Sequence, residues 1–156
     1  MSELTDLDRI DRRILAHLQD DGRMSNLKLA EAVALSPTAV LARVQRLTRD
    51  GFIQGYQAVL NPQLLGARML VFVEVLLDRT NANVFEQFKA AVEVRPEVLE
   101  CHLVAGGFDY LLKIRTADMD SYRRFSGEVL WLLPGVRETR TYAVMEEVKN
   151  STALAL

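Results

Sequence analysis

Residues 36–49 carry the sequence SPTAVLARVQRLTR, which decides the fold of the first third of the chain. Ser36 is a preferred residue at a helix N-cap, because its hydroxyl accepts a hydrogen bond from a free backbone N–H. Pro37 suits the first helical position, where an N–H is not needed. The apolar residues recur at helical spacing: Val40, Val44 and Leu47. The stretch therefore predicts an amphipathic helix that runs to Asp50 and ends at Gly51, a residue suited to the left-handed stop.

Two shorter amphipathic segments precede this helix. The first has apolar residues at helical spacing: Leu7, Ile10, Ile14 and Leu18. In the second, Ser25 is placed to cap a brief helix with a small apolar face: Leu29, Ala30 and Val33. Three short helices with a tight turn between the last two predict a helix-turn-helix. Residues 52–60 then predict a strand pair, or wing, closed by Asn61 and Pro62.

The charge pattern indicates a local contact with phosphates. Residues 1–60 hold eight Lys or Arg and eight Asp or Glu, yet residues 36–49 hold three arginines and no acid. Small residues allow a helix to approach a major groove, and arginines reach base edges or phosphates. The DNA-contacting residues predicted on this helix are Ser36, Pro37, Thr38, Ala39, Ala42, Arg43 and Arg46. The alternatives are a solvated arginine face, or a three-helix unit that docks a protein.

The second half predicts four strands and two helices. Strand patterns cover residues 69–77, 98–105, 110–116 and 136–148, and helical patterns cover 83–94 and 118–133. This βαββαβ order is typical of ferredoxin-like folds, so the predicted class is α+β. We expect a DNA-binding domain over 1–60, a linker over 61–67 and a second domain over 68–156. Two helices can cover only one face of a four-stranded sheet, so we expect the other face to pack against a second copy in a homodimer. Such a dimer supplies two recognition helices for successive half-sites on DNA.

Other features of the sequence exclude several classes of protein and of site. The single cysteine, Cys101, excludes an internal disulfide and suits the reducing cytoplasm, and we expect it to be a buried strand residue. No apolar run is long enough to cross a membrane, and the N-terminus has no secretory pattern. No metal-ligand spacing or nucleophile–base pair is present, and His17 and His102 suit structural or solvent-facing positions. We expect a cytoplasmic protein without a cofactor, without metal and without enzymatic activity.

Several stretches together resemble the Lrp/AsnC family of prokaryotic transcription regulators, most closely its leucine-responsive members. They are LSPT at 35–38, RVQRL at 43–47, GFIQGY at 51–56, ECHLVAG at 100–106, FDYLL at 108–112, LPGV at 133–136 and TRTYAVMEEVK at 139–149. The resemblance extends from about Leu7 to Ser151. It implies a winged helix-turn-helix joined to an amino-acid-sensing ferredoxin-like domain, in dimers that assemble further, commonly into octamers.

The resemblance also implies an effector site between neighbouring dimers, around a glycine-containing turn. The effector-binding residues carried over are Leu103, Ala105, Gly106, Gly107, Phe108, Asp109, Tyr110, Met119, Tyr142 and Val144. Backbone N–H groups of a glycine turn can approach a carboxylate, Asp109 can accept from the ammonium, and Leu103, Met119 and Val144 suit a leucine-like or methionine-like side chain. Relatives often carry an acid where this chain has Gly107, which leaves the identity of the amino acid open. Without the resemblance, the turn is an ordinary hairpin with Asp109 as its polar cap.

Two alternatives from other classes stay open at this level. Decarboxylases of haem biosynthesis share the two-part scaffold, so the fold does not exclude catalysis. A ligand-sensing interaction module without DNA binding is the other alternative, and the intact Ser36–Thr38 segment with Arg43 and Arg46 argues against it.

Overall fold

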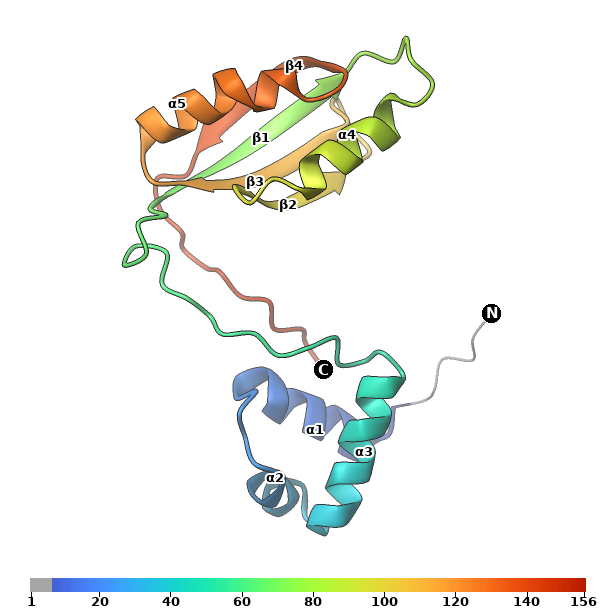
Figure 1. Ribbon diagram of the computed structural model, residues 1–156. Helices are drawn as coiled ribbons and strands as arrows, with labels where there is room; N and C mark the ends of the chain where they lie inside the picture. Colours follow the sequence, from blue (N-terminus) through green and yellow to red (C-terminus); the bar gives the residue numbers. More distant parts are fainter. Residues whose placement is uncertain (1–6) are drawn as a thin grey trace. The chain divides into compact units, whose positions relative to one another are not determined.

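The computed structural model describes residues 7–156, which divide into two compact units (Figure 1). The N-terminal unit contains residues 7–59 together with Lys149–Leu156, and the second unit is Leu60–Val148. The sequence had assigned residues 149–156 to the second domain. In the structure this tail joins the first unit, where the Gln19 side chain donates to the backbone oxygen of Leu154 (3.1 Å) and accepts from its N–H (2.7 Å).

The N-terminal unit is built from three helices, α1 (Arg9–Asp20), α2 (Asn26–Val33) and α3 (Pro37–Arg49). The predicted caps are confirmed: Ser25 accepts from the N–H of Lys28, and Ser36 accepts from that of Ala39. Gly51 ends α3 with a φ of 82°, a conformation that glycine adopts without strain. The helices enclose one apolar core: Ile14, Leu29, Ala30, Val33, Val40 and Leu47. The predicted helix-turn-helix is present.

The predicted strand pair over residues 52–60 is wrong for this chain. The N–H groups of Phe52 and Ile53 donate to the oxygen of Leu47, and the residues that follow form no strand. The side chain of Val59 is fully exposed. A strand needs a partner for its backbone groups, and no other described segment of the chain pairs with this one.

The second unit contains β1 (Met69–Leu77), α4 (Val84–Glu93), β2 (Val98–Leu103), β3 (Tyr110–Thr116), α5 (Met119–Glu128), a 3₁₀ turn (Leu130–Leu132) and β4 (Val136–Ala143). The strands form an antiparallel sheet in the order β2-β3-β1-β4. Helices α4 and α5 lie on the same face of this sheet (Figure 1). The predicted order and fold class are confirmed.

The core of this unit lies between the sheet and the two helices. Alternate residues of β1 and β3 face the helices and are buried: Val71, Val73, Val75, Leu77, Tyr110, Leu112 and Ile114. Helix α4 adds Phe88, whose ring centroid lies 4.7 Å from that of Tyr110. The other residues of these strands lie on the face that no helix covers, which is called here the open face.

Three predicted elements are longer than the observed ones. Strand β4 ends at Ala143, because the N–H of Val144 makes the last bond to β1, at Leu70, the second residue of that strand. Strand β2 ends at Leu103, since the following N–H closes the turn onto the oxygen of Asp109. Helix α5 gives way to the 3₁₀ turn after Glu128. Cys101 is exposed rather than buried, because β2 is an edge strand.

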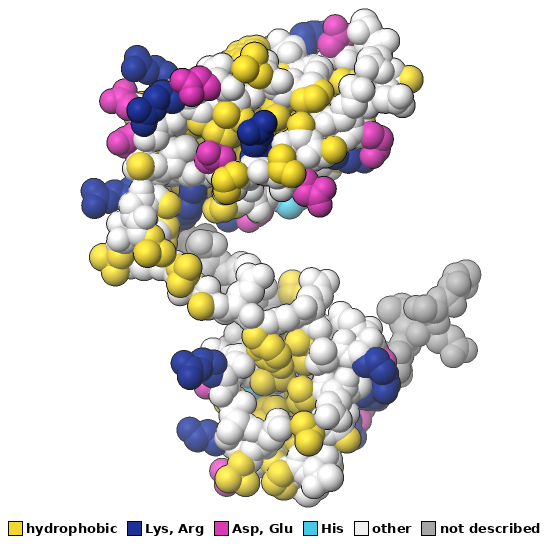
Figure 2. All heavy atoms as spheres, viewed as in Figure 1, with side chains coloured by type: hydrophobic (Ala, Val, Ile, Leu, Met, Phe, Trp, Pro, Cys, Tyr) yellow, Lys and Arg dark blue, Asp and Glu magenta, His cyan; other side chains and the backbone are white. Residues whose placement is uncertain are grey.

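Apolar side chains remain on the surface of both units (Figure 2). None of the helices described over residues 7–156 is long and apolar enough to span a membrane.

Candidate nucleic-acid interface and ligand region

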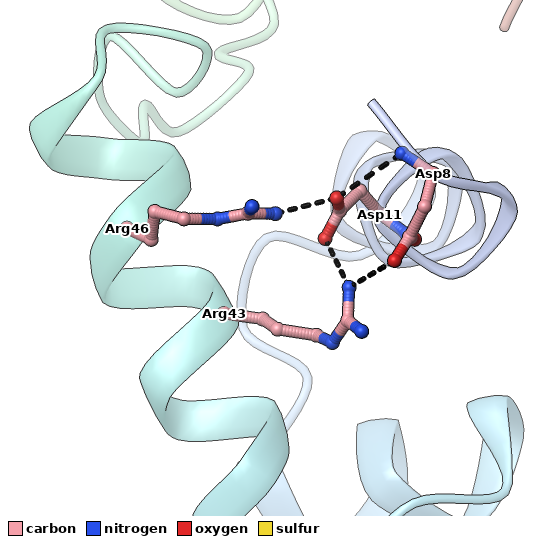
Figure 3. Close-up of polar contacts among 4 residues, drawn as sticks. All are labelled: Asp8, Asp11, Arg43 and Arg46. Atoms are coloured by element: carbon pink, nitrogen blue, oxygen red, sulfur yellow. Dashed lines mark hydrogen bonds and ion pairs between the residues drawn. The ribbon is translucent and has the colours of Figure 1, made fainter. Parts of the chain in front are cut away.

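Two acids of α1 bind the two arginines of α3 (Figure 3). The Arg43 guanidinium donates through Nη1 to Asp8 at 2.7 Å and to Asp11 at 2.8 Å, and Arg46 donates to the other oxygen of Asp11. Asp8 and Asp11 also form the capping box that begins α1. This group of four residues is called here the acid–arginine cluster, and it fastens α3 to the first turn of α1.

The burial of Asp11 gives the cluster a structural role. The Asp11 side chain is 1% exposed, whereas those of Arg43 and Arg46 are 29% and 34% exposed. A buried carboxylate needs charged or hydrogen-bonding partners, and here it accepts from both guanidinium groups. The backbone N–H of Asp11 and the Arg43 guanidinium lower the pKa of Asp8, while Asp8 and Asp11 raise that of Arg43. The four charges sum to zero.

The cluster changes what Arg43 and Arg46 can do. The sequence places them on a free face of the recognition helix, but their side chains leave α3 toward α1 (Figure 3). Each guanidinium has five N–H donors, and only part of them is used by the acids. Both side chains keep about a third of their surface exposed, so their remaining donors are accessible from outside.

The outward side of α3 is formed by other residues. Of those predicted to contact DNA, Ser36, Pro37, Thr38 and Ala42 are exposed and Ala39 is partly buried. Sequence reasoning missed two polar residues on the same side, Gln45 and Arg49. Both are exposed, and the Arg49 side chain is 74% exposed although it bonds Asp50 at 3.0 Å.

The sequence did contain a signal for the cluster. Asp11 lies four residues after Leu7 and three before Ile14, so it falls within the apolar stripe of the first helix. An acid at such a position turns inward and requires a cationic partner. The arginines of a helix that has no acids of its own are the natural candidates.

The glycine turn between β2 and β3 is anchored to the end of β1. The backbone N–H of Asp109 donates to Val75, and its carboxylate accepts from the N–H of Leu77 at 2.8 Å and pairs with Arg79. The residue is 2% exposed. The carboxylate predicted to accept from an effector's ammonium is therefore already engaged within the fold.

The two glycines of this turn are not required by the turn itself. Neither Gly106 nor Gly107 has a positive φ, and a Cβ at either position would meet no atom of residues 7–156 within 4 Å apart from its own chain neighbours. Their backbone is thus open to close approach from outside the chain.

The predicted effector residues are divided between the two ends of the sheet. Residues 103–110 lie beside the Val75–Leu77 end of β1, because Leu103 pairs with Tyr110 and Tyr110 with Val75. Met119 and Val144 lie at the other end, roughly 17 Å of strand away. Tyr142 lies between the two ends, opposite Phe72, and its side chain reaches Glu74. A single chain therefore keeps Met119 and Val144 away from the glycine turn.

A hollow of about 330 Å³ opens beside the turn. It contains two of the predicted residues, Gly107 and Phe108, and five that were not predicted: Glu74, Leu76, Glu138, Thr139 and Arg140. Arg140 lies 3.5 Å from Glu138, and the Tyr142 hydroxyl donates to Glu74 at 3.1 Å. A cation, two carboxylates and apolar groups in one recess match the chemistry of a free amino acid.

The open face carries both apolar and charged side chains. From the two central strands come Phe72, Leu76 and Leu111, together with Glu74, Lys113 and Arg115. Glu100 of edge strand β2 binds Lys113 of β3 at 2.8 Å and His102 at 3.1 Å, and both contacts lower the pKa of Glu100. His102 is solvent-facing, as predicted. Apolar side chains among hydrogen-bonding and charged groups are the usual composition of an interface between proteins. Among residues 7–156, no three His, Cys, Asp or Glu side chains gather as metal ligands.

Comparisons with known proteins match both halves of the chain. A family profile for a winged helix-turn-helix DNA-binding domain matches residues 7–54, and the profile of the Lrp/AsnC ligand binding domain matches residues 70–154. The leucine-responsive regulatory protein of Salmonella typhimurium is 61% identical over 151 residues, which cover 97% of this chain and 92% of that protein.

Solved structures agree with this similarity. A transcriptional regulator of Neisseria meningitidis, solved as a complex with L-methionine, has a TM-score of 0.93 at 35% identity, over 96% of this chain and 97% of that one. An AsnC family regulator from Agrobacterium tumefaciens has a TM-score of 0.90 at 31% identity, over 95% and 96% of the two chains.

Proposed function

Because the chain belongs to the Lrp/AsnC family, we propose that it is a sequence-specific DNA-binding transcription regulator whose assembly and DNA binding respond to an amino acid. The observation that carries this proposal is the construction of α3. The helix is capped by Ser36, fastened to α1 through Asp11, and free of acidic residues from end to end. A rigid, acid-free helix suits insertion into a major groove.

We expect the N-terminal half of α3 to approach the groove most closely. Ser36, Pro37, Thr38, Ala39 and Ala42 are small enough to let the backbone come near base edges. The free donors of Arg43 and Arg46 are placed to contact phosphates while their acid partners hold them. Phosphate contacts position a protein on a duplex without reading its sequence.

The effector is proposed to be an amino acid with a leucine-like or methionine-like side chain. At one end of the sheet, Arg140 suits its carboxylate, Glu74 and Glu138 suit its ammonium, and Leu76 and Phe108 supply apolar contact. The open backbone at Gly106 and Gly107 permits close approach. Met119 and Val144 would come from a neighbouring copy, since one chain keeps them away from the turn, whereas Tyr142 reaches Glu74 within the same chain.

We propose that two copies pair through their open faces into a homodimer. We further propose that these dimers assemble into an octamer, the arrangement that the family resemblance implies. Covering Phe72, Leu76 and Leu111 with a second copy removes their surface from water. The dimer carries two copies of α3 for two half-sites. A ligand that binds one assembly better than another then shifts DNA affinity through that assembly.

The proposed role is regulatory rather than enzymatic, and it is exercised in the cytoplasm. The relatives named above are regulators, and none of the comparisons supports a decarboxylase. A tetrapyrrole titration followed by absorbance tests this point, and saturable binding would reopen the enzymatic alternative.

A melting-temperature screen of the purified chain against the twenty amino acids, followed by sedimentation with each hit, tests the sensing role. A ligand at a hundred times its Kd stabilises the folded state by about 2.7 kcal/mol, which moves the melting temperature by several degrees. If no amino acid changes melting temperature, size or DNA affinity, the sensing role is wrong.

A further inference from the structure

The outward side of α3 is a stripe of four residues. Thr38, Ala42, Gln45 and Arg49 follow one another at spacings of four, three and four residues, which places them on one face of a helix. This face lies opposite the residues that α3 buries, Val40 and Leu47. All four stripe residues are exposed.

The acid–arginine cluster lies to one side of this stripe. Arg43 and Arg46 turn toward α1 and bind Asp8 and Asp11, so their guanidinium groups do not extend along the outward direction of the helix (Figure 3). To read a base edge, either arginine would have to give up its ion pair with the buried carboxylate of Asp11, which would then keep only one guanidinium partner, at a substantial cost.

Gln45 has no such engagement. Among residues 7–156, no group hydrogen-bonds its side-chain amide, so its donor and acceptor are both available. The neighbouring stripe residue, Ala42, ends in a methyl group and leaves space for a base pair beside the amide. At the end of the stripe, Arg49 is largely exposed and suited to a phosphate.

From this arrangement we propose that Gln45 is the residue of α3 that reads sequence, and that the base it reads is adenine. A glutamine amide forms two parallel hydrogen bonds with N6 and N7 of adenine, and an alanine methyl contacts the methyl group of thymine. The stripe therefore selects an A·T pair in each half-site. Arg43 and Arg46 are positioning residues that hold this stripe at a fixed angle on α1. The proposal rests on the DNA-binding function proposed above.

The test compares the sequences that wild-type and variant proteins enrich from a pool of randomised double-stranded DNA. Gln45→Ala is the informative variant, since an exposed side chain is removed and the melting temperature should not change. Gln63→Ala, an exposed glutamine outside the three helices, is the matched control. Arg43→Ala is the third variant, and its melting temperature is measured alongside.

We expect the wild type and Gln63→Ala to enrich the same motif. Gln45→Ala should lose its preference for A·T at one position in each half-site by about tenfold, which is typical of one bidentate pair, and should keep the other positions. Arg43→Ala should keep the motif, because Arg46 still binds Asp11 and holds the stripe in place, and should bind all sequences more weakly.

The possible failures are distinguishable. If the wild type enriches no motif, the proposed DNA-binding function is wrong. If the wild type enriches a motif and Gln45→Ala enriches the same one with unchanged discrimination, this inference is overturned. Loss of discrimination at a G·C position in Gln45→Ala, or in Arg43→Ala alone, also overturns it.

Discussion

Asp11 lies on the buried side of α1, and its carboxylate is surrounded by the donors of two arginines and the backbone of its own helix turn. A carboxylate with 1% of its side chain exposed has lost its hydration, so the fold holds it only through these partners. The acid–arginine cluster thus sets the angle of α3 on α1. That angle in turn sets the direction of the α3 residues proposed to face the major groove of DNA.

Asp11→Ala should therefore destabilise the N-terminal unit by about 2 kcal/mol or more, since it removes the capping box and leaves two guanidinium groups without their shared acid. Urea unfolding followed by circular dichroism measures the change. Asp20→Ala, which removes an exposed acid from the same helix, is the control and should change stability by less than about 0.5 kcal/mol. Equal midpoints for the two variants would contradict the role given to Asp11.

A second prediction at this scale concerns pH. The pKa of folded Asp8 lies below its ordinary value of 3.8, first because of the Asp11 N–H and then because of Arg43. A group whose folded pKa is depressed stabilises the fold above its unfolded pKa, and this contribution is lost as the pH falls through the folded value. Below about pH 4 the N-terminal unit of wild type should therefore lose stability more steeply than that of Asp8→Asn, as acid titration of melting temperature would show. Parallel curves would contradict the assignment.

At the scale of elements, the junction before β4 depends on a single glycine. Gly135 has a φ of 73°, and an added Cβ would lie 2.0 Å from Cγ2 of Val84, a buried residue at the start of α4. The Asp78 N–H also donates to the Gly135 oxygen, so the backbone there is fixed from both sides.

Gly135→Ala should cost about 2–3 kcal/mol, because strain at a positive φ adds to overpacking against Val84. Gly127→Ala is the matched control: a Cβ there meets nothing within 4 Å, and alanine favours the helix by up to about 1 kcal/mol. The melting temperature should fall for the first and stay or rise for the second. The opposite order would show that the junction is not constrained as described.

The β2–β3 turn gives a further test. Asp109→Asn removes the ion pair with Arg79 and weakens the bond to the Leu77 N–H, so it should cost about 1–3 kcal/mol of stability. Asp78→Asn, an exposed acid nearby, is the control. If Asp109→Asn keeps the wild-type melting temperature and loses its response to amino acids, the carboxylate serves a ligand rather than the fold.

The sequence predicted the parts of this fold that local rules control. Ser25, Ser36, Pro37 and Gly51 stand at helix ends because capping and φ depend on a few adjacent residues. The order of strand and helix patterns in the second half likewise predicted a four-stranded sheet with two helices on one face. The ends of β2 and β4 were not predicted, because a strand ends where its partner ends, and that depends on distant residues.

The candidate sites were less predictable for the same reason. The residue types on α3 indicated a DNA face, but the direction of Arg43 and Arg46 depends on Asp8 and Asp11, which lie more than thirty residues earlier. In the effector region, Arg140 and Glu74 meet the glycine turn only through the register of β1 and β4. Pairing between distant strands is not visible in spacing along the chain.

At the scale of the whole molecule, the residues proposed to read DNA and those proposed to bind the ligand belong to separate units, α3 to the first and the glycine turn to the second. Coupling between them is therefore proposed to pass through the association of copies. Such coupling is reciprocal: an amino acid that strengthens DNA binding is itself bound more tightly by the DNA complex.

The most direct test of the account is one titration by fluorescence anisotropy. The purified chain is added to a labelled duplex carrying the enriched motif, and to a shuffled duplex of the same composition, with and without each amino acid at fixed salt. We expect the motif to be bound about a thousandfold more tightly than the shuffled duplex, and at least one amino acid to change that affinity by about 5- to 150-fold. Equal affinity for the two duplexes, unchanged by every amino acid, would contradict the account.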